Sequence, residues 1–319
     1  MKWALAFLVL AGGLAWVLGP REPVDRTAEF DPAALSDDLD AWLAQREAEV
    51  PDLRAGAEKR IVWAGTPGER TALSLVYVHG FSAAAEEIRP VPDLVAAALG
   101  ANLHYTRLTG HGRDGSAMAE ATAGDWVRDL AEAVEIGRRI GERVVLIGTS
   151  TGGTLIALAA HEAALGRDVA GLVFVSPNFR VSAAGSGLLT APWARSWVPL
   201  LIGAERAFVP HNPRQAAHWT TRYPTEAVIP MAALVAHVRD LDHDAVSLPA
   251  LFLYSEHDTV VSPGETGRVA WAWGGAAHVE TLVMGPEDDP DSHVIAGDIM
   301  SPGQSAGVAA LIAGWAGAL

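Results

Sequence analysis

The sequence predicts an α/β fold with a mostly parallel central sheet, helices on both of its faces and a short cap inserted above it. From residue 60 onward, apolar runs of strand length alternate with helical stretches, which is typical of a parallel sheet with crossover helices. Residues 178–245 interrupt this rhythm, because they contain no good core strand but many Leu, Trp and Pro residues. An insertion this apolar must be buried against another surface, so we expect a cap over one edge of the sheet.

The N-terminal segment differs in kind from the rest of the chain. After two residues, an uncharged apolar run extends from Trp3 to Leu18 and ends at Gly19-Pro20. As a helix the run would be about 24 Å long, shorter than the roughly 30 Å hydrocarbon core of a bilayer, and no clean cleavage site precedes Pro20. We expect residues 1–20 to be an export signal retained as a membrane anchor, with the body in the periplasm or otherwise outside the cytoplasm. A buried N-terminal helix is the alternative.

Residues 21–59 are expected to form a linker and one short amphipathic helix, in which Ser36 is the N-cap and Arg46 the last residue. The α/β domain then covers residues 60–319. Its expected strands are the short apolar runs Ile61–Ala64, Leu73–Val78, Asn102–Leu108, Val144–Gly148, Leu172–Ser176, Ala250–Tyr254 and Val279–Met284. Its expected helices are Pro92–Leu99, Trp126–Ile140, Leu155–Leu165, Glu226–Val238 and Gly307–Ala318.

The composition excludes several classes of function. Half of the 319 residues are hydrophobic and 19% are charged, as in a globular protein. The formal charge of −15 argues against nucleic acid or an anionic membrane surface as a partner of the folded body. The chain has no cysteine, which excludes disulfides, thiolate metal sites and a cysteine nucleophile. The sequence does not indicate the oligomeric state.

The most informative motif is Gly148-Thr-Ser-Thr-Gly152. An apolar strand precedes it and an Ala- and Leu-rich helix follows, which is the strand–turn–helix setting of a nucleophile elbow. The two glycines are needed because strand and helix backbones come close together at such a turn. The turn would place the Ser150 hydroxyl at the carboxyl end of the sheet, beside the positive N-terminus of a helix.

An alcohol needs a neighbouring base to act as a nucleophile at neutral pH. In this setting the acid and the His follow the Ser along the chain, each after a later strand. Asp258 follows the strand Ala250–Tyr254 and is preferred to Glu256, which lies closer to the strand. Of eleven histidines only His293 follows the last core strand; His278 is the second choice. Asp291 lies too close to His293 in sequence and is more simply a solvated loop charge.

An oxyanion-binding site is expected beside Ser150. The strand Leu73–Val78 ends in His79-Gly80-Phe81-Ser82, and the turn after this strand normally supplies one backbone N–H, with Thr151 N–H as the other. Gly80 allows the backbone to bend toward a substrate, and Phe81 can wall an acyl pocket.

These motifs, together with Gly110-His-Gly112 and His293-Val294, resemble the α/β-hydrolase superfamily, and most closely its bacterial carboxylesterases and monoacylglycerol-lipase-like enzymes. The resemblance covers roughly residues 60–319. It implies Ser150 as nucleophile, Asp258 as orienting acid, His293 as base, and the backbones of Phe81 and Thr151 as oxyanion donors. Thr151 departs from the Met or Gln that is common at this position, which affects the shape of the pocket rather than the chemistry.

The expected function is hydrolysis of a small carboxylic ester, such as a monoacylglycerol, through an acyl-enzyme and without a metal or organic cofactor. Phe81 and three apolar residues of the cap are the expected substrate contacts: Trp193, Trp197 and Leu200. Two alternatives stay open from the sequence. The same triad could cleave an amide or peptide or transfer an acyl group, or the chain could be a membrane-tethered binding protein that has lost catalysis.

Overall fold

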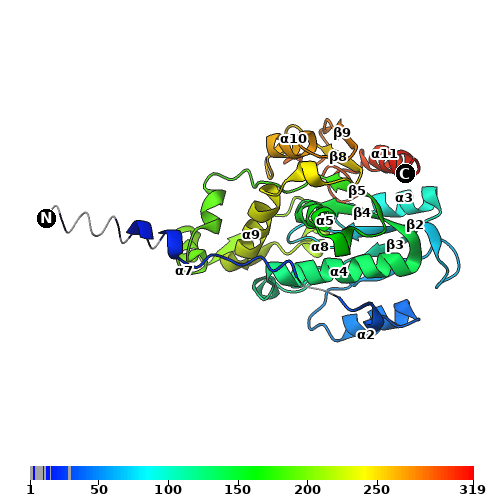
Figure 1. Ribbon diagram of the computed structural model, residues 1–319, viewed down its shortest axis with the longest axis horizontal. Helices are drawn as coiled ribbons and strands as arrows, with labels where there is room; N and C mark the ends of the chain where they lie inside the picture. Colours follow the sequence, from blue (N-terminus) through cyan, green and yellow to red (C-terminus); the bar gives the residue numbers. More distant parts are fainter. Residues whose placement is uncertain (1–2, 4–9, 11, 15, 28–29) are drawn as a thin grey trace.

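A seven-stranded sheet lies at the centre of the molecule (Figure 1). The computed structural model describes residues 3, 10, 12–14, 16–27 and 30–319. In this part of the chain the strand order is β1-β3-β2-β4-β5-β8-β9, with every neighbouring pair parallel except β1 and β3. The strands are β1 Arg60–Val62, β2 Thr71–Val78, β3 Asn102–Tyr105, β4 Gly141–Thr149, β5 Val169–Val175, β8 Ala250–Tyr254 and β9 Ala277–Thr281. The predicted mostly parallel sheet is therefore confirmed.

Helices cover both faces of this sheet. One face carries α4 and α5, whose buried side chains include Trp126, Leu130 and Leu158; the other carries α3 and α11, which bury Val95 and Ile312. The helices of the domain outside the cap are α3 Val91–Leu99, α4 Ala123–Ile140, α5 Thr151–His161, α6 Ala163–Gly166, α10 Pro263–Trp271 and α11 Ser305–Ala316. Each covering helix buries an apolar stripe, so together they close the core around the β4 strand that leads to Ser150.

The N-terminal helix α2 (Leu39–Ala48) begins later than the sequence indicates. Its N-cap is Asp38, whose carboxylate accepts the Ala41 N–H at 2.9 Å, so the assignment of Ser36 as N-cap is wrong. The Ser36 hydroxyl instead donates to the Asp38 carbonyl, which holds the chain in the extended turn before the helix. Leu39 and Leu43 pack against Ile136 and Ile140 of α4, and α2 lies below α4 in Figure 1.

The insertion between β5 and β8 forms the cap, and it lies at the end of the molecule from which the N-terminal arm projects (Figure 1). Its elements are α7 Ala194–Ile202, β6 Glu205–Ala207, α8 Pro213–His218, β7 Arg222–Pro224 and α9 Val228–Arg239. The helix predicted at Glu226–Val238 corresponds to α9. The two short strands pair antiparallel with each other and not with the central sheet, which agrees with the absence of a core strand from this stretch of the sequence.

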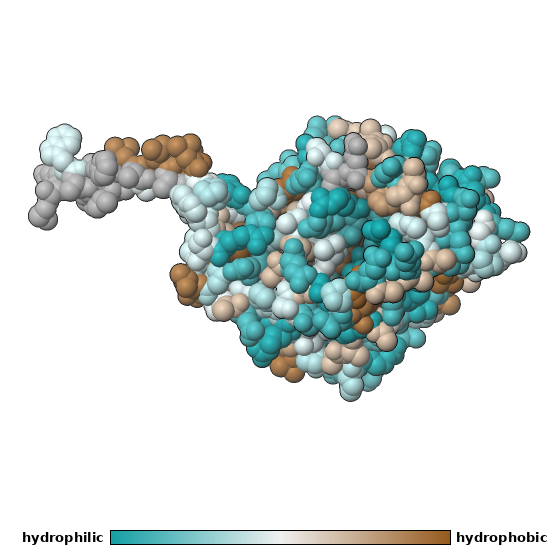
Figure 2. Space-filling view, turned by 90° about the horizontal axis from the view of Figure 1, so that it is seen from below, coloured by the Kyte–Doolittle hydropathy of each residue, from teal (hydrophilic) through white to brown (hydrophobic). Residues whose placement is uncertain are grey.

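The N-terminal segment leads onto the cap. Within the described residues, no helix is both long enough and apolar enough to cross a membrane. Much of the expected anchor, namely residues 1–2, 4–9, 11 and 15, lies outside the described residues. The described apolar side chains next to the body, Trp16 to Leu18, are at least half exposed, and Figure 2 shows hydrophobic residues on the coloured part of the arm where it joins a largely hydrophilic body.

Candidate active site

Ser150 occupies the sharp turn between β4 and α5. Its backbone has φ 51° and ψ −116°, a region that is unfavourable for a residue with a side chain. The turn is held by hydrogen bonds from the Ser150 N–H to the Val175 carbonyl (3.0 Å) and from the Asn178 N–H to the Ser150 carbonyl (2.9 Å). At Gly152 an added Cβ would lie only 2.0 Å from the carbonyl oxygen of Val78, so this position requires glycine. The nucleophile elbow expected from the sequence is thus present as a strained turn locked by its neighbours.

Asp258 and His293 meet at the same edge of the sheet. Asp258 follows β8, and its Oδ2 accepts the Nδ1–H of His293 at 2.8 Å. The other oxygen, Oδ1, accepts the backbone N–H groups of Val260 (2.8 Å) and Val261 (2.9 Å). Since Asp258 accepts a hydrogen bond from Nδ1–H and so keeps the proton on that nitrogen, a neutral His293 has an unprotonated Nε2, which is the form that a general base requires.

The other acids and bases considered from the sequence lie elsewhere. Asp291 is about half exposed and accepts a hydrogen bond from the Thr259 hydroxyl at 3.0 Å. His278 lies on the exposed strand β9 and contacts Glu280. Glu256 is exposed after β8. None of these three residues forms the hydrogen bond with His293 that Asp258 forms.

Charges around His293 favour its protonated form. Burial by itself would lower the pKa of His293, but the charge of Asp258 and the hydrogen bond to it, followed by the charges of Glu87 and Asp289, raise this pKa above its ordinary value. The loop that carries His293 is also held rigidly, because Asp289 Oδ2 accepts the N–H groups of His293 (3.0 Å) and Val294 (2.7 Å). The imidazole can therefore accept a proton without a change in its position.

The backbone N–H groups expected to bind an oxyanion are free of other partners. In the described part of the chain neither the Phe81 N–H nor the Thr151 N–H donates a hydrogen bond. The peptide that carries the Phe81 N–H is held through the Gly80 carbonyl, which accepts the His79 Nδ1–H at 2.9 Å. Burial lowers the pKa of His79 to about 4, so the ring is neutral, and its Nε2 accepts the Leu108 N–H at 3.0 Å. His79 is thus a link between the oxyanion turn and the loop after β3.

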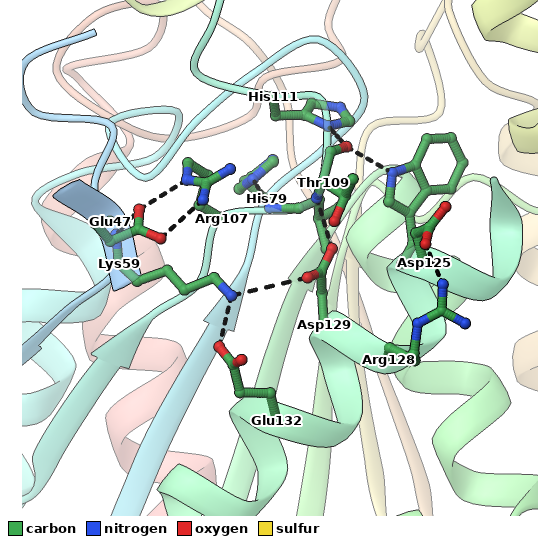
Figure 3. Close-up of polar contacts among 12 residues, drawn as sticks. Glu47, Lys59, His79, Arg107, Thr109, His111, Asp125, Arg128, Asp129 and Glu132 are labelled. Atoms are coloured by element: carbon green, nitrogen blue, oxygen red, sulfur yellow. Dashed lines mark hydrogen bonds and ion pairs between the residues drawn. The ribbon is translucent and has the colours of Figure 1, made fainter. Parts of the chain in front are cut away.

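That loop is held in turn by buried charges (Figure 3). Glu47 of α2 forms a two-pronged ion pair with Arg107, with N···O distances of 2.7 and 2.8 Å. Asp129 of α4 accepts the N–H of Thr109 at 2.6 Å, and Lys59 lies 3.8 Å from the same carboxylate. Because Glu47 and Arg107 are buried and Lys59 and Asp129 are mostly buried, the positions of the loop and of His79 depend on charges supplied by the N-terminal helix and α4.

The expected substrate contacts fall into two groups. The Phe81 ring is partly buried and makes edge-to-face contacts with Trp126 and with Tyr223 of the cap, at ring-centre distances of 6.2 and 5.3 Å. Trp193 packs against the Gly19 segment, and the Trp197 indole donates to the carbonyl of Pro192. Leu200 is 87% exposed. These positions give the pocket assignments of Trp193, Trp197 and Leu200 no added support, and the assignments stay predictions. Tyr223, which the sequence did not single out, is the cap residue that touches Phe81.

One group of side chains has the composition of a metal site. The ligand atoms of His211, Asp289 and Asp291 lie within 4.8 Å of one another. However, Asp289 already accepts three backbone N–H groups, those of Asp291, His293 and Val294. We therefore assign Asp289 to the support of the His293 loop.

Residues 70–281 match the family model described as serine aminopeptidase, S33. The match spans more than half of the chain, which therefore belongs to this family and has the α/β-hydrolase fold. The resemblance inferred from the motifs is thereby confirmed.

The individual proteins to which the chain is similar include monoacylglycerol lipases and other lipolytic enzymes. The chain is similar to the thermostable monoacylglycerol lipase of Bacillus sp. (strain H-257), with 27% identity over 197 residues that cover 61% of this chain and 74% of the relative. A structure from work on LipS and LipT, two metagenome-derived lipolytic enzymes, superposes with a TM-score of 0.68 and 19% identity, covering 84% of this chain and 100% of the other. The structure of a soluble variant of monoglyceride lipase from Saccharomyces cerevisiae superposes with a TM-score of 0.63 and 12% identity, covering 81% of this chain and 90% of the other. At these low identities, the two structures show only that this chain shares their fold.

Proposed function

We propose that the protein is a serine ester hydrolase that cleaves carboxylic esters with an apolar acyl chain, with monoacylglycerol as the first candidate substrate. The observation that carries the proposal is the buried Asp258–His293 pair at the sheet edge that also presents Ser150. The similarity to a monoacylglycerol lipase supports the choice of substrate class. The apolar residues of the cap and of the N-terminal arm support it as well.

In the proposed reaction, His293 Nε2 removes the proton of Ser150 while Oγ attacks the ester carbonyl carbon. The N–H groups of Phe81 and Thr151 bind the resulting oxyanion. The carbon–oxygen bond to the alcohol then breaks, and His293 donates its proton to the leaving alkoxide. A water molecule, deprotonated by His293, attacks the acyl-enzyme and releases the carboxylic acid. Asp258 keeps the proton on Nδ1 and stabilises the imidazolium without taking that proton.

The test compares esters of increasing acyl length, 1-monoacylglycerols and aminoacyl p-nitroanilides, with Ser150→Ala as the control. We expect turnover of esters and monoacylglycerols and a loss of about a million-fold in kcat for Ser150→Ala. A fluorophosphonate probe should label the wild-type protein at Ser150. Faster turnover of the anilides than of any ester would contradict the proposal, and so would a folded protein that the probe does not label.

We further propose that residues 1–20 hold the enzyme at a membrane, with the body outside the cytoplasm. Three contacts support a fixed orientation of the body toward that membrane. The Pro20 carbonyl accepts the Trp193 N–H at 2.8 Å, Arg21 donates to the Thr190 carbonyl at 2.6 Å, and Glu22 pairs with Arg195 of the cap at 2.6 Å. This geometry would turn the cap toward the lipid that contains the substrate.

Cell fractionation tests this second proposal. The full chain should sediment with membranes, whereas a variant without residues 1–20 should be released into the soluble fraction with its activity intact. Protease added to intact spheroplasts should digest the body. Sedimentation that does not depend on residues 1–20, or protection from the protease, would contradict the proposed anchoring or topology respectively.

A further inference from the structure

Glu87 is a buried carboxylate beside the proposed active site for which the reaction described above has no use. It is only 3% exposed, and among the described residues no Lys or Arg forms an ion pair with it. Its neighbour Glu86, by contrast, pairs with Arg60 and Arg89. Burying a carboxylate without a cationic partner costs several kcal/mol, so its position calls for a specific role.

The contacts of Glu87 are with the oxyanion turn. Its Oε2 accepts the Gly80 N–H at 2.7 Å and the Tyr77 hydroxyl at 2.8 Å. A Cβ added to Gly80 would lie 2.6 Å from Glu87 Oε1 and 3.1 Å from Ser150 Cβ. The carboxylate and the nucleophile therefore flank the same glycine.

The backbone of Glu87 also touches the segment that carries His293. A Cβ added to Gly297 would lie 2.8 Å from the Glu87 carbonyl oxygen, and the Asp298 N–H donates to the Arg89 carbonyl at 2.8 Å. The turn around Glu87 is thus packed between the oxyanion turn and the loop of the proposed base. Movement of this turn would displace both.

Two consequences follow for the reaction. With the Gly80 N–H held by Glu87 and the Gly80 carbonyl held by His79, the peptides on both sides of Gly80 are fixed, and the next N–H, that of Phe81, remains free. In addition, burial raises the pKa of Glu87, whereas the hydrogen bonds from Gly80 and Tyr77 and the charge of His293 lower it, so the ionised carboxylate is most favoured when the imidazole is protonated. That state is formed when Ser150 attacks, so this interaction stabilises the transition state more than the ground state.

Resting on the ester-hydrolase function proposed above, we propose that Glu87 is a positioning residue for this reaction. Its carboxylate aligns the oxyanion turn through the Gly80 N–H, and its charge stabilises His293 after proton transfer. The charged or titratable groups that act on His293 are Asp258, Glu87 and Asp289, and those that act on Glu87 are Tyr77 and His293.

Two substitutions separate the two parts of the proposal. Glu87→Ala removes the acceptor and the charge, and we expect kcat to fall about 30-fold with KM changed less than about threefold, since misplacing an oxyanion donor costs less than losing it. Glu87→Gln retains an oxygen that can accept the Gly80 N–H, so its kcat should be about tenfold higher than that of Glu87→Ala. Because the Gln variant lacks the charge, the acidic limb of its kcat/KM profile should move to lower pH by about 0.5. Glu86→Gln, in the same turn, is the matched control and should behave as the wild type.

Each outcome decides one part. Equal losses in Glu87→Ala and Glu87→Gln with no change in the pH profile indicate a merely structural residue and overturn the proposal, as does a kcat of Glu87→Ala within about twofold of wild type. A Gln variant whose acidic limb stays in place contradicts the electrostatic part alone. If Glu87→Ala does not fold, the pH profile of the isosteric Gln variant still decides the electrostatic part of the proposal.

The same variants distinguish this inference from the function on which it rests. The rate of Ser150 labelling by a fluorophosphonate depends on the nucleophile, base and oxyanion donors but not on the natural substrate. If the wild type hydrolyses no ester, the proposed function fails, while about 30-fold slower labelling of Glu87→Ala would still support the positioning role. Equal labelling rates would overturn it.

Discussion

Replacing Asp258 by Asn should remove most of the activity without unfolding the protein, because the structure determines which way the amide must point. Asp258 Oδ1 accepts two backbone N–H groups, from Val260 and Val261. An Asn side chain has only one acceptor oxygen, and facing its NH₂ group toward two donors would leave all three unpaired. The oxygen therefore stays at Oδ1, and the NH₂ group takes the place of Oδ2, opposite His293 Nδ1.

This arrangement reverses the tautomer of His293. With an N–H donor facing it, Nδ1 must become the acceptor, and the ring proton moves to Nε2, which can no longer take a proton from Ser150. The expected loss in kcat is about 10,000-fold, or about 5.5 kcal/mol of transition-state stabilisation. The two backbone hydrogen bonds are kept, so the free energy of unfolding should change by less than about 2 kcal/mol.

The measurement is the kcat of p-nitrophenyl ester hydrolysis, together with unfolding in urea to show that the variant is folded. Asp291→Asn is the matched control, because Asp291 belongs to the His293 loop but its side chain is 52% exposed; its kcat should stay within about twofold of wild type. A folded Asp258→Asn protein that retains more than about a tenth of the activity would refute the tautomer argument. A large loss in Asp291→Asn would show that the wrong acid had been chosen.

Three further predictions concern stability. Gly152→Ala would place a Cβ 2.0 Å from the Val78 carbonyl oxygen, so unfolding in urea should show a loss of at least about 3 kcal/mol, whereas Gly187→Ala, which has no atom within 4 Å, should be nearly neutral. Glu47→Leu leaves Arg107 buried without its partner and should cost about 3–5 kcal/mol in the same measurement; the double variant with Arg107→Met should recover most of it. The third prediction concerns the loss of folding stability at acidic pH. Burial lowers the pKa of several histidines, most clearly that of His79 to about 4, that of His104 to about 3 and that of His243 to about 4. They are neutral in the folded protein but bind protons in the unfolded chain below about pH 6.5, so their contribution is complete above that pH and is lost as the pH falls toward 4, by up to about 1.4 kcal/mol per pH unit for each. Urea unfolding between pH 7 and 4.5 should show this decline, and an unchanged midpoint would contradict it.

The elements with strong local patterns were predictable from the sequence. The run Val144–Gly148 lies inside β4, and the Gly-rich turn after it forms the elbow at Ser150. Asp258 and His293 could be chosen because parallel strands bring their carboxyl ends to one edge, so residues after different strands become neighbours. In these cases position along the chain was enough to predict proximity in space.

The supporting residues were not predictable in this way. Glu86 and Glu87 are adjacent and chemically identical in the sequence, yet Glu86 forms partly buried ion pairs with two arginines, whereas Glu87 is buried against Gly80 without one. The difference depends on how the chain turns back after β2, for which a run of Ala and Glu contains no periodic pattern. Asp289 lies in an acidic loop of four carboxylates, and only the fold shows that it binds the backbone of His293. Here tertiary contacts, rather than residue type, decide the role.

The N-terminal region illustrates the same limit on a larger scale. Composition separates residues 21–59 from the α/β domain, and the resemblance to known hydrolases does not cover them. In the structure, however, Glu47 of α2 neutralises Arg107, which lies in the loop after β3 that His79 binds through the Leu108 N–H. His79 in turn holds the peptide that carries the Phe81 N–H. A segment that resembles a linker by its sequence is thus connected to the oxyanion turn through three consecutive buried contacts. Truncations intended to remove only the N-terminal arm should therefore end before α2, since any that include Glu47 would leave the buried guanidinium of Arg107 without its ion-pair partner.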